Sequence, residues 1–166
     1  NETAARPYDA VPVPRVIPLG LQAGLKFRTW EIKSPWVPTL NSLNEEPRNT
    51  GIAQGFEIPG TEINNENVTA FEGFIDIPAT GEYTFHLKVN GKAIMRLHKA
   101  LLIDADKNYQ PGSEITAVIK LEKGLHPGSL IFTGGSAPDI QLEWSGPGFK
   151  QRSPEASRLR HKNSSL

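Results

Sequence analysis

The side chains best suited to acid–base or metal chemistry in this chain of 166 residues are four histidines. They are His86, His98, His126 and His161. A protein zinc site usually shows ligand pairs at short spacing, such as H-x-H or HExxH, because one local element then aims both ligands at the ion. The four histidines fall on different predicted elements and form no such pair. Their spacing argues against a metal–histidine cluster.

Other catalytic patterns are equally sparse. Asp104 and Asp106 are close enough to share a calcium ion, but calcium needs several oxygen ligands, and we expect a solvated loop there. No G-x-S-x-G pattern marks a serine nucleophile, and a chain without cysteine has no thiol nucleophile and no thiolate metal site. Gly134-Gly-Ser136 lacks the lysine and the helix of a phosphate-binding loop. The sequence therefore predicts no catalytic residue.

Three aromatic side chains with polar neighbours suit stacking against a sugar ring: Trp36, Tyr109 and Trp144. An aromatic ring offers a flat apolar face, and the polar tip of Trp or Tyr can still form a hydrogen bond. Trp36 lies in the proline-containing loop Ser34-Pro-Trp-Val-Pro38. A tryptophan that packs beneath its loop is the commoner arrangement, so sugar stacking and packing both stay open for Trp36.

The elements that must position these residues are organised around residues 71–104. Within this stretch four apolar residues alternate with polar ones, a period of two that is typical of a strand with one buried face: Tyr83, Phe85, Leu87 and Val89. Asn90-Gly91 follows and strongly indicates a hairpin turn. The stretch predicts a meander of short strands, which needs a second sheet to bury its apolar face.

The remaining chain supplies further strands. Alternating or apolar runs predict strands in these ranges: 25–32, 52–58, 114–121, 125–132 and 140–144. We count about nine strands and no helical periodicity, which predicts an all-β fold, a two-sheet antiparallel β-sandwich. The 15 glycines and 14 prolines, spread between these runs, indicate many turns.

The two ends of the chain differ from its middle. Residues 1–23 contain three prolines between Val11 and Pro18, so we expect an extended linker or edge segment rather than a central strand. Residues 24–160 form the predicted sandwich, and 161–166 a polar basic tail. With 18 basic and 18 acidic residues, no global field attracts nucleic acid or an anionic membrane, and no apolar run is long enough to span a bilayer.

Several motifs occur in a recognisable order along the chain. The longest are FEGFIDIPATGEYTFHL at 71–87, ITAVIKLEKGL at 115–125 and IQLEWSGPG at 140–148. With Gly24-Leu-Lys-Phe27 before them and Pro154-Glu-Ala-Ser-Arg-Leu159 after them, they resemble the protective-antigen (PA-fourteen) domain family over roughly residues 24–160. The resemblance implies a β-sandwich module.

The resemblance also locates a calcium site. Sugar-binding adhesin members of the family hold calcium through two consecutive aspartates before a glycine, and here that place reads Val89-Asn90-Gly91. A later turn, I-D-G in the family, reads Leu97-His98-Lys99. Both departures remove carboxylates. We therefore expect no metal and no other cofactor, with calcium disfavoured, and an Asn90-Gly91 turn that keeps its geometry without the ion.

The function implied by the resemblance is a non-catalytic carbohydrate-binding or accessory module of a larger extracytoplasmic carbohydrate-active enzyme, of glycosidase or sulfatase type. The expected ligand-binding residues are Trp36, Asn90, His98 and Tyr109. The expected partners are a glycan or polysaccharide and the catalytic domain of the same polypeptide, in a secreted, periplasmic or cell-surface setting. The alternative is a purely structural sandwich that packs against a catalytic domain through an exposed apolar patch and binds no sugar.

Overall fold

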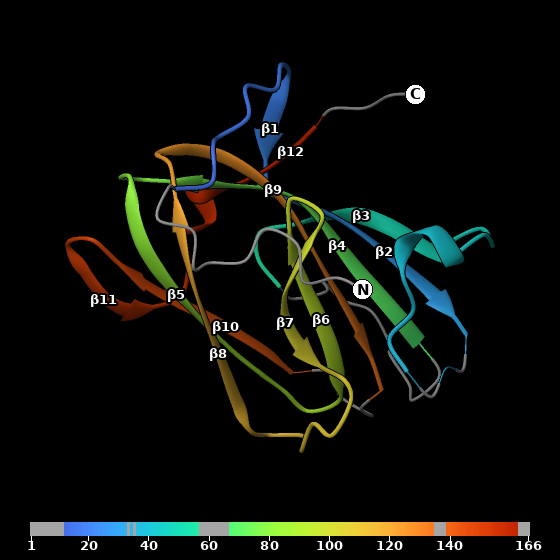
Figure 1. Ribbon diagram of the computed structural model, residues 1–166. Helices are drawn as coiled ribbons and strands as arrows, with labels where there is room; N and C mark the ends of the chain where they lie inside the picture. The colour runs from blue at the N-terminus through green and yellow to red at the C-terminus, as the bar shows by residue number, and fades with distance from the viewer. Residues whose placement is uncertain (1–11, 33, 35, 57–66, 135–138, 163–166) are drawn as a thin grey trace.

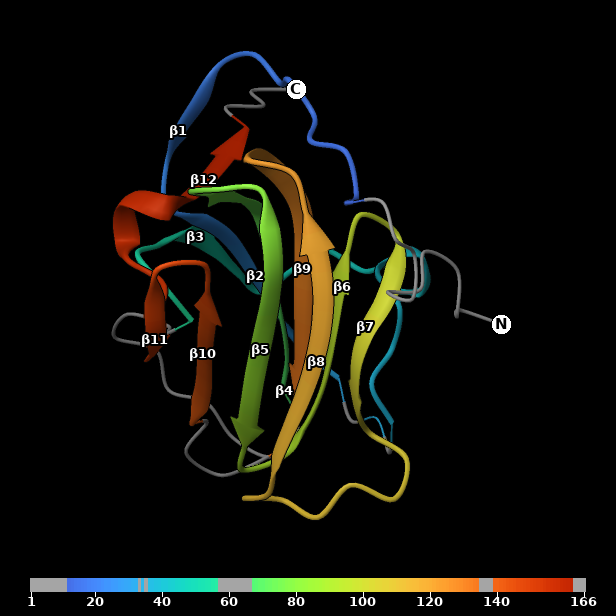
Figure 2. The same ribbon diagram turned by 60° about the vertical axis from the view of Figure 1, so that its left-hand side comes forward.

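The computed structural model describes residues 12–162 except 33, 35, 57–66 and 135–138, and within these ranges it is a sandwich of two antiparallel sheets (Figures 1 and 2). The predicted fold class is confirmed. The two short 3-10 helices, η1 (Leu40–Ser42) and η2 (Ala156–Arg158), complete the described elements. No helix among the described residues has the length and apolar character needed to cross a membrane.

The larger sheet contains eight strands, with β1, β12, β4, β9, β6 and β7 in spatial order and β2 and β3 attached through β4. Their bounds are β1 Leu21–Ala23, β2 Leu25–Glu31, β3 Asn49–Ala53, β4 Asn67–Ile77, β6 Lys92–Leu97, β7 Ala100–Ala105, β9 Gly124–Thr133 and β12 Leu159–Lys162. The smaller sheet has the order β11, β10, β5, β8. Its strands are β5 Gly81–Val89, β8 Glu114–Leu121, β10 Ile140–Gly146 and β11 Phe149–Arg152.

The first and the last described segments of the chain both take part in the sandwich. Val13 forms a parallel bridge with Leu121 and Val16 an antiparallel bridge with Leu125, so the proline-containing segment lies along the sheets. Strand β1 pairs with β12, and Leu21 is the partner of Lys162. The described ends of the chain therefore extend the larger sheet at one edge.

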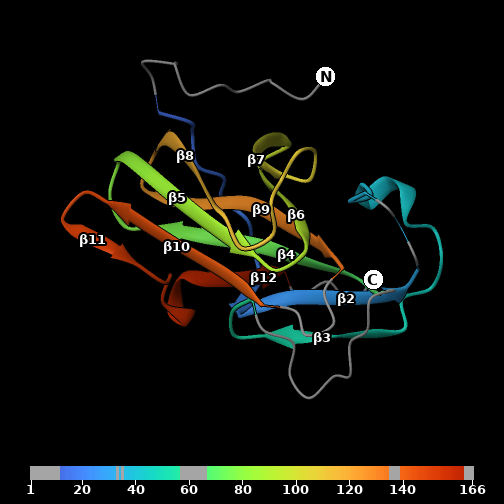
Figure 3. The ribbon, with the colours of Figure 1, turned by 90° about the horizontal axis from the view of Figure 1, so that it is seen from below.

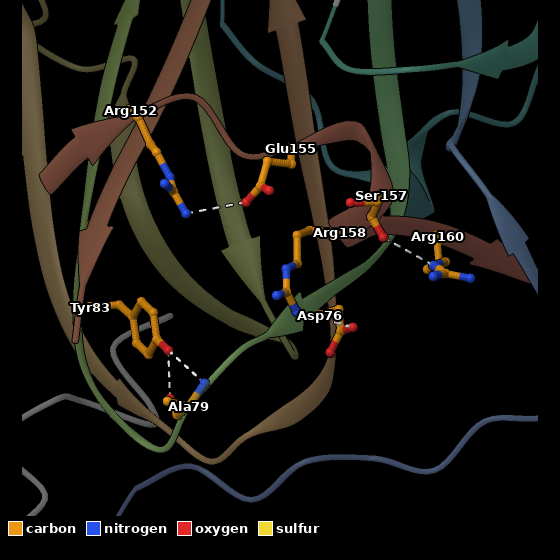
Figure 4. Close-up of polar contacts among 8 residues, drawn as sticks. All are labelled: Asp76, Ala79, Tyr83, Arg152, Glu155, Ser157, Arg158 and Arg160. Atoms are coloured by element: carbon orange, nitrogen blue, oxygen red, sulfur yellow. Dashed lines mark hydrogen bonds and ion pairs between the residues drawn. The ribbon is translucent and has the colours of Figure 1, made fainter. Parts of the chain in front are cut away.

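The main core lies between the sheets, where the period-two pattern places the apolar residues. Tyr83 stacks on Trp144 with ring centroids 5.5 Å apart, and Phe149 packs 5.2 Å from Trp144. Trp144 is completely buried, so its predicted availability to a sugar is wrong. The hydroxyl of Tyr83 donates to the carbonyl oxygen of Ala79 at 2.5 Å and accepts from the Ala79 N–H at 3.1 Å (Figure 4). This side chain therefore fixes the β4–β5 turn to the core.

A second apolar cluster covers part of the outer face of the larger sheet. It contains Trp30, Val37, Val68, Ala70 and Ile131. The segment after β2, which includes η1, folds back over this face at the end of β2 (Figure 3). The Nε1–H of Trp30 donates to the carbonyl oxygen of Glu45 at 2.9 Å and holds the segment down. Beyond this cluster, the segment does not cover the outer face of the larger sheet.

We expect Tyr83→Phe to lower the free energy of unfolding by about 1–3 kcal/mol, because it leaves the N–H and C=O of Ala79 without their partner while it keeps the ring in the core. Urea unfolding followed by tryptophan fluorescence measures the change, with an unchanged denaturant slope as the control for a two-state transition. Coincident midpoints for variant and parent would show that the hydroxyl does not stabilise the turn.

Candidate functional site

The turn between β5 and β6 forms the centre of one end of the sandwich. The N–H of Asn90 donates to the carbonyl oxygen of Asp139 at 3.2 Å, and its side-chain oxygen accepts from the Asp139 N–H at 2.8 Å. A Cβ at Gly91 would lie 2.4 Å from the carbonyl oxygen of Thr133. Only glycine fits this close approach of two backbones. The Asn90-Gly91 turn is thereby locked to the strands beside it.

Tyr109 attaches the β7–β8 loop to this turn. Its hydroxyl accepts from the N–H of Val89 at 3.1 Å and lies 2.6 Å from the carbonyl oxygen of Ser113 and 3.1 Å from that of Val89. Its ring packs against the main core. The polar tip of Tyr109 is thus committed to the backbone, and the residue supports the loop.

Asp106 joins a third segment to the same end. One carboxylate oxygen accepts from the N–H of Val37 at 2.9 Å, and the other lies 3.5 Å from Nζ of Lys92. The Asp104 carboxylate accepts from the N–H of Asp106 at 2.9 Å. These carboxylates serve contacts within the protein, and no group of three His, Cys, Asp or Glu suited to a metal occurs among the described residues. Calcium binding here stays a disfavoured prediction.

Trp36 extends from the segment that Asp106 holds. Its side chain is 63% exposed, and its carbonyl oxygen accepts from the hydroxyl of Ser34 at 2.6 Å. The interpretation that Trp36 packs beneath its loop is wrong, because its side chain faces solvent. The tryptophan that packs together with Val37 of this segment is Trp30, which is only 2% exposed.

Three of the four predicted ligand-binding residues therefore meet at one end. We call this surface the loop end and define it by Trp36, Asn90, Lys92, Asp104, Asp106, Tyr109 and Asp139. Lys92 and Asp139 are members of the loop end that were not predicted. Lys92 directly follows the Asn-Gly turn, and this position could have indicated that it lies at the loop end. Nothing in the sequence indicated that Asp139 lies beside Asn90, because the fold brings the two residues together.

His98 lies away from this surface. His98 follows the last residue of β6, while Asn90 precedes the first one. The 6 residues of β6 therefore separate His98 from Asn90 by about 20 Å. Nε2 of His98 is 2.9 Å from Nδ1 of the fully buried His126, whose Nε2 is 2.7 Å from the carbonyl oxygen of Glu122. A carbonyl only accepts, so we assign the proton of His126 to Nε2, and His98 then donates to Nδ1.

The histidine pair favours the neutral form. Burial lowers the pKa of His98 below its ordinary value of 6.5, and the charge of His126 lowers it further. Burial also lowers the pKa of His126, opposed by its bond to the Glu122 carbonyl and by the charge of Glu122. The unfolded chain therefore binds these protons at a higher pH than the folded chain does. The stability linked to the pair is complete above the unfolded pKa and is lost as the pH falls below it.

We expect the melting temperature of the protein to fall between pH 7 and pH 5, and to fall less in His98→Asn. Asparagine tolerates the positive φ of 57° at this position and removes one imidazole that unfolding would protonate. Thermal unfolding followed by circular dichroism across that range measures the difference. Lys99→Asn, at the next exposed position, is the matched control. An equal fall in the parent and His98→Asn would contradict the linkage.

Comparison with protein families gives one match that spans most of the chain. The family model described as "PA14 domain" matches residues 21–158. No curated protein matches the chain. The matched range contains every residue of the loop end.

Three solved structures share the fold. An anti-sigma factor domain-containing protein from Clostridium clariflavum is 23% identical, with a TM-score of 0.67, 93% of this chain covered and 50% of that one. The epithelial adhesin 9 A domain from Candida glabrata, in complex with Galb1-3GlcNAc, is 9% identical, with a TM-score of 0.68 and coverage of 93% and 98%. A β-glucosidase from Kluyveromyces marxianus, in complex with glucose, is 20% identical, with a TM-score of 0.59 and coverage of 74% and 15%. The chain thus spans half the length of the anti-sigma factor protein and a smaller part of the glucosidase.

Proposed function

The chain belongs to the PA14 domain family, and from this we propose that it is a non-catalytic carbohydrate-binding module that binds a glycan at the loop end. One observation carries the proposal: Trp36 is exposed to solvent on a segment that Asp106 holds beside the Asn90-Gly91 turn. A flat apolar ring among polar groups suits the C–H face of a sugar.

The surroundings of Trp36 supply hydrogen-bonding groups for hydroxyls. Asn90, Asp104 and Asp139 are exposed at the loop end, and Asn90 and Asp104 are held by backbone hydrogen bonds. Groups fixed before binding lose little conformational entropy when a ligand arrives. The arrangement of one ring and a few oriented polar side chains supports a shallow site for one or two sugar units.

The proposed site works without a metal. At the turn, Val89 has no ligand oxygen, and the side-chain oxygen of Asn90 accepts from Asp139. The carboxylate oxygens of Asp106 face Val37 and Lys92. Sugar recognition in this module is therefore proposed to rest on Trp36 and direct hydrogen bonds, with no calcium ion between protein and glycan.

The proposed setting is a larger extracytoplasmic carbohydrate-active enzyme of glycosidase or sulfatase type. Partial coverage of the longer structural matches supports a module within a longer chain, and the matching β-glucosidase supports an enzyme as the parent. The adhesin structure with a bound disaccharide supports a glycan as the ligand and an extracellular location. The catalytic domain of this proposed parent enzyme would act on the polysaccharide that the module binds.

A packing role without sugar binding is the second candidate. Ile17 and Leu19, on either side of Pro18 in the segment before β1, are 75% and 82% exposed, and these apolar side chains would suit contact with another domain. This candidate predicts that substitution at Ile17 and Leu19, rather than at Trp36, weakens association with a partner domain.

We expect a broad glycan array to show binding by the parent protein both with calcium and with chelator, and Trp36→Ala to lose roughly tenfold or more in affinity for the glycan found, the loss of one stacked ring. Leu19→Ala, which removes another exposed apolar side chain, far from the turn in sequence, is the matched control and should bind as the parent does.

Three results would contradict this proposal. Binding that disappears with chelator would mean that a metal mediates recognition despite Val89 and Asn90. Equal affinity of Trp36→Ala and the parent would move the site away from the loop end. Absence of binding in both buffers would favour the packing role.

A further inference from the structure

A second open surface lies on the outer face of the larger sheet, next to the part that the Trp30 cluster covers. Strands β2, β4, β9 and β12 line a depression of ≈ 370 Å³ there. Its charged and large apolar lining residues are Lys26, Arg28, Glu72, Phe74, Pro127 and Lys162. We call this surface the sheet face.

Strand register places these side chains on the side away from the core. Lys26 is the partner of Glu72, and Phe74 is the partner of both Pro127 and Arg160. Partnered residues in antiparallel strands point to the same face of a sheet, and successive residues point to opposite faces. Since Leu25 and Phe27 are buried in the main core, Lys26 and Arg28 must point outward.

The sheet face carries an excess of positive charge although the whole chain has none. Its lining contains three cations, Lys26, Arg28 and Lys162, against the single carboxylate of Glu72. Glu72 lies 2.5 Å from Nη2 of Arg28. No carboxylate of the described residues pairs with Lys26 or Lys162. An anion that reaches the depression therefore meets two lysines that are paired with no carboxylate in the part of the chain that the structure describes.

Arg28 is held in place before any ligand arrives. Its guanidinium lies over the Trp30 ring, 5.2 Å from the centroid, and Glu72 fixes one end of the planar group. Among the described residues only Glu72 accepts a hydrogen bond from it, while its side chain is 30% exposed. A guanidinium has five N–H donors in a rigid plane and can bind a carboxylate through two parallel hydrogen bonds. The stacked Arg28 is therefore a positioned donor for a second carboxylate.

Phe74 and Pro127 place an apolar strip between these cations. Both are half-buried and are direct partners across β4 and β9. A sugar ring can lie its C–H face on such a strip while its charged substituent reaches a cation. The combination of apolar strip and flanking cations distinguishes the sheet face from a surface that merely holds scattered lysines.

The cationic surface continues along β12 and β4. Figure 4 shows Arg158 directed at Asp76, 3.4 Å apart, and Arg160 directed to the carbonyl oxygen of Ser157 at 3.3 Å. Asp76 on β4 is thus paired with Arg158. Arg160 lines an adjoining depression of ≈ 400 Å³ together with Arg15 and Asp76. Two open depressions that follow one another along the surface suit a polymer better than a single sugar.

We propose that the sheet face is a second binding site, distinct from the loop end, and that it takes a polyuronate, a polysaccharide chain of uronic acids. A sugar ring of the polymer lies on Phe74 and Pro127, and one of its carboxylates pairs with Arg28. Carboxylates of the neighbouring sugar units pair with Lys26 and Lys162. The carboxylate of a uronic acid can form with a guanidinium the same bidentate pair that protein carboxylates form. The site goes beyond the proposed function, since the loop end and the sheet face share no residue.

The test is titration calorimetry of the whole chain with a panel of polyuronates, each compared with the same polymer after methyl esterification of its carboxyls. We expect binding to at least one free-acid polymer, weaker binding as salt rises, and none to its neutral ester. Lys26→Glu/Lys162→Glu should lower the affinity at least about tenfold, because two attractions become repulsions. Phe74→Ala should lower it too, with less change in salt dependence.

Matched controls separate this site from general charge and from the loop end. Lys120→Glu/Lys150→Glu makes the same change in net charge on the smaller sheet and should leave polyuronate affinity within about twofold. Trp36→Ala should also leave it unchanged, so failure of the loop-end proposal and failure of this one give different results. Circular dichroism confirms that each variant is folded.

The proposal is overturned if no polyuronate binds, if the methyl esters bind as tightly as the free acids, or if the control pair weakens binding as much as the Lys26/Lys162 pair. It is also overturned if dextran sulfate binds more tightly than every polyuronate, since the surface would then recognise sulfate rather than carboxylate.

Discussion

Burial of the two apolar inner faces against each other is the constraint from which both candidate surfaces follow. In an extended strand each inward residue sends its neighbour outward, so the core decides what the outer faces can present. On β4, Phe71 and Ile75 belong to the main core, and Glu72 and Phe74 therefore lie on the sheet face. The same rule on β2 buries Leu25 and Phe27 and exposes Lys26 and Arg28 to the outer side. The sheet face is thus a direct consequence of packing.

The loop end is a consequence of how the strands are connected. Three segments far apart in sequence meet where β5 ends, and each is tied by hydrogen bonds to backbone: Asn90 to Asp139, Tyr109 to Val89, and Asp106 to Val37. The hydroxyl of Tyr109 contacts three backbone groups and its ring packs against the main core, so this residue has a structural role. The side chain of Trp36 faces solvent.

The two surfaces differ in the ligand chemistry they offer. The loop end presents one exposed ring with carboxylate and amide groups, which suits neutral sugars through stacking and hydrogen bonds. The sheet face presents a stacked guanidinium and two lysines around a half-buried ring, which suits carboxylated sugars. A chain with balanced total charge can hold both because its 18 basic and 18 acidic residues are unevenly placed. A module with two such surfaces would contact a polysaccharide at more than one point.

The sequence by itself determined the fold class, because period-two alternation in Tyr83–Val89 and the Asn90-Gly91 turn are local signals that tertiary contacts reinforce. It also indicated Trp36 and the turn as candidate site residues. It did not determine which tryptophan would be buried: Trp30 and Trp36 are similar in chemistry, and only the position of the outer sheet face selects Trp30 for the cluster. It did not indicate that His98 lies beside the buried His126, because strand pairing brings the two together. It also did not indicate that His98 lies about 20 Å from Asn90, because that separation depends on the length of β6. The sheet face was equally hidden, because Lys26, Glu72, Phe74 and Lys162 come from three strands that become neighbours only through long-range pairing.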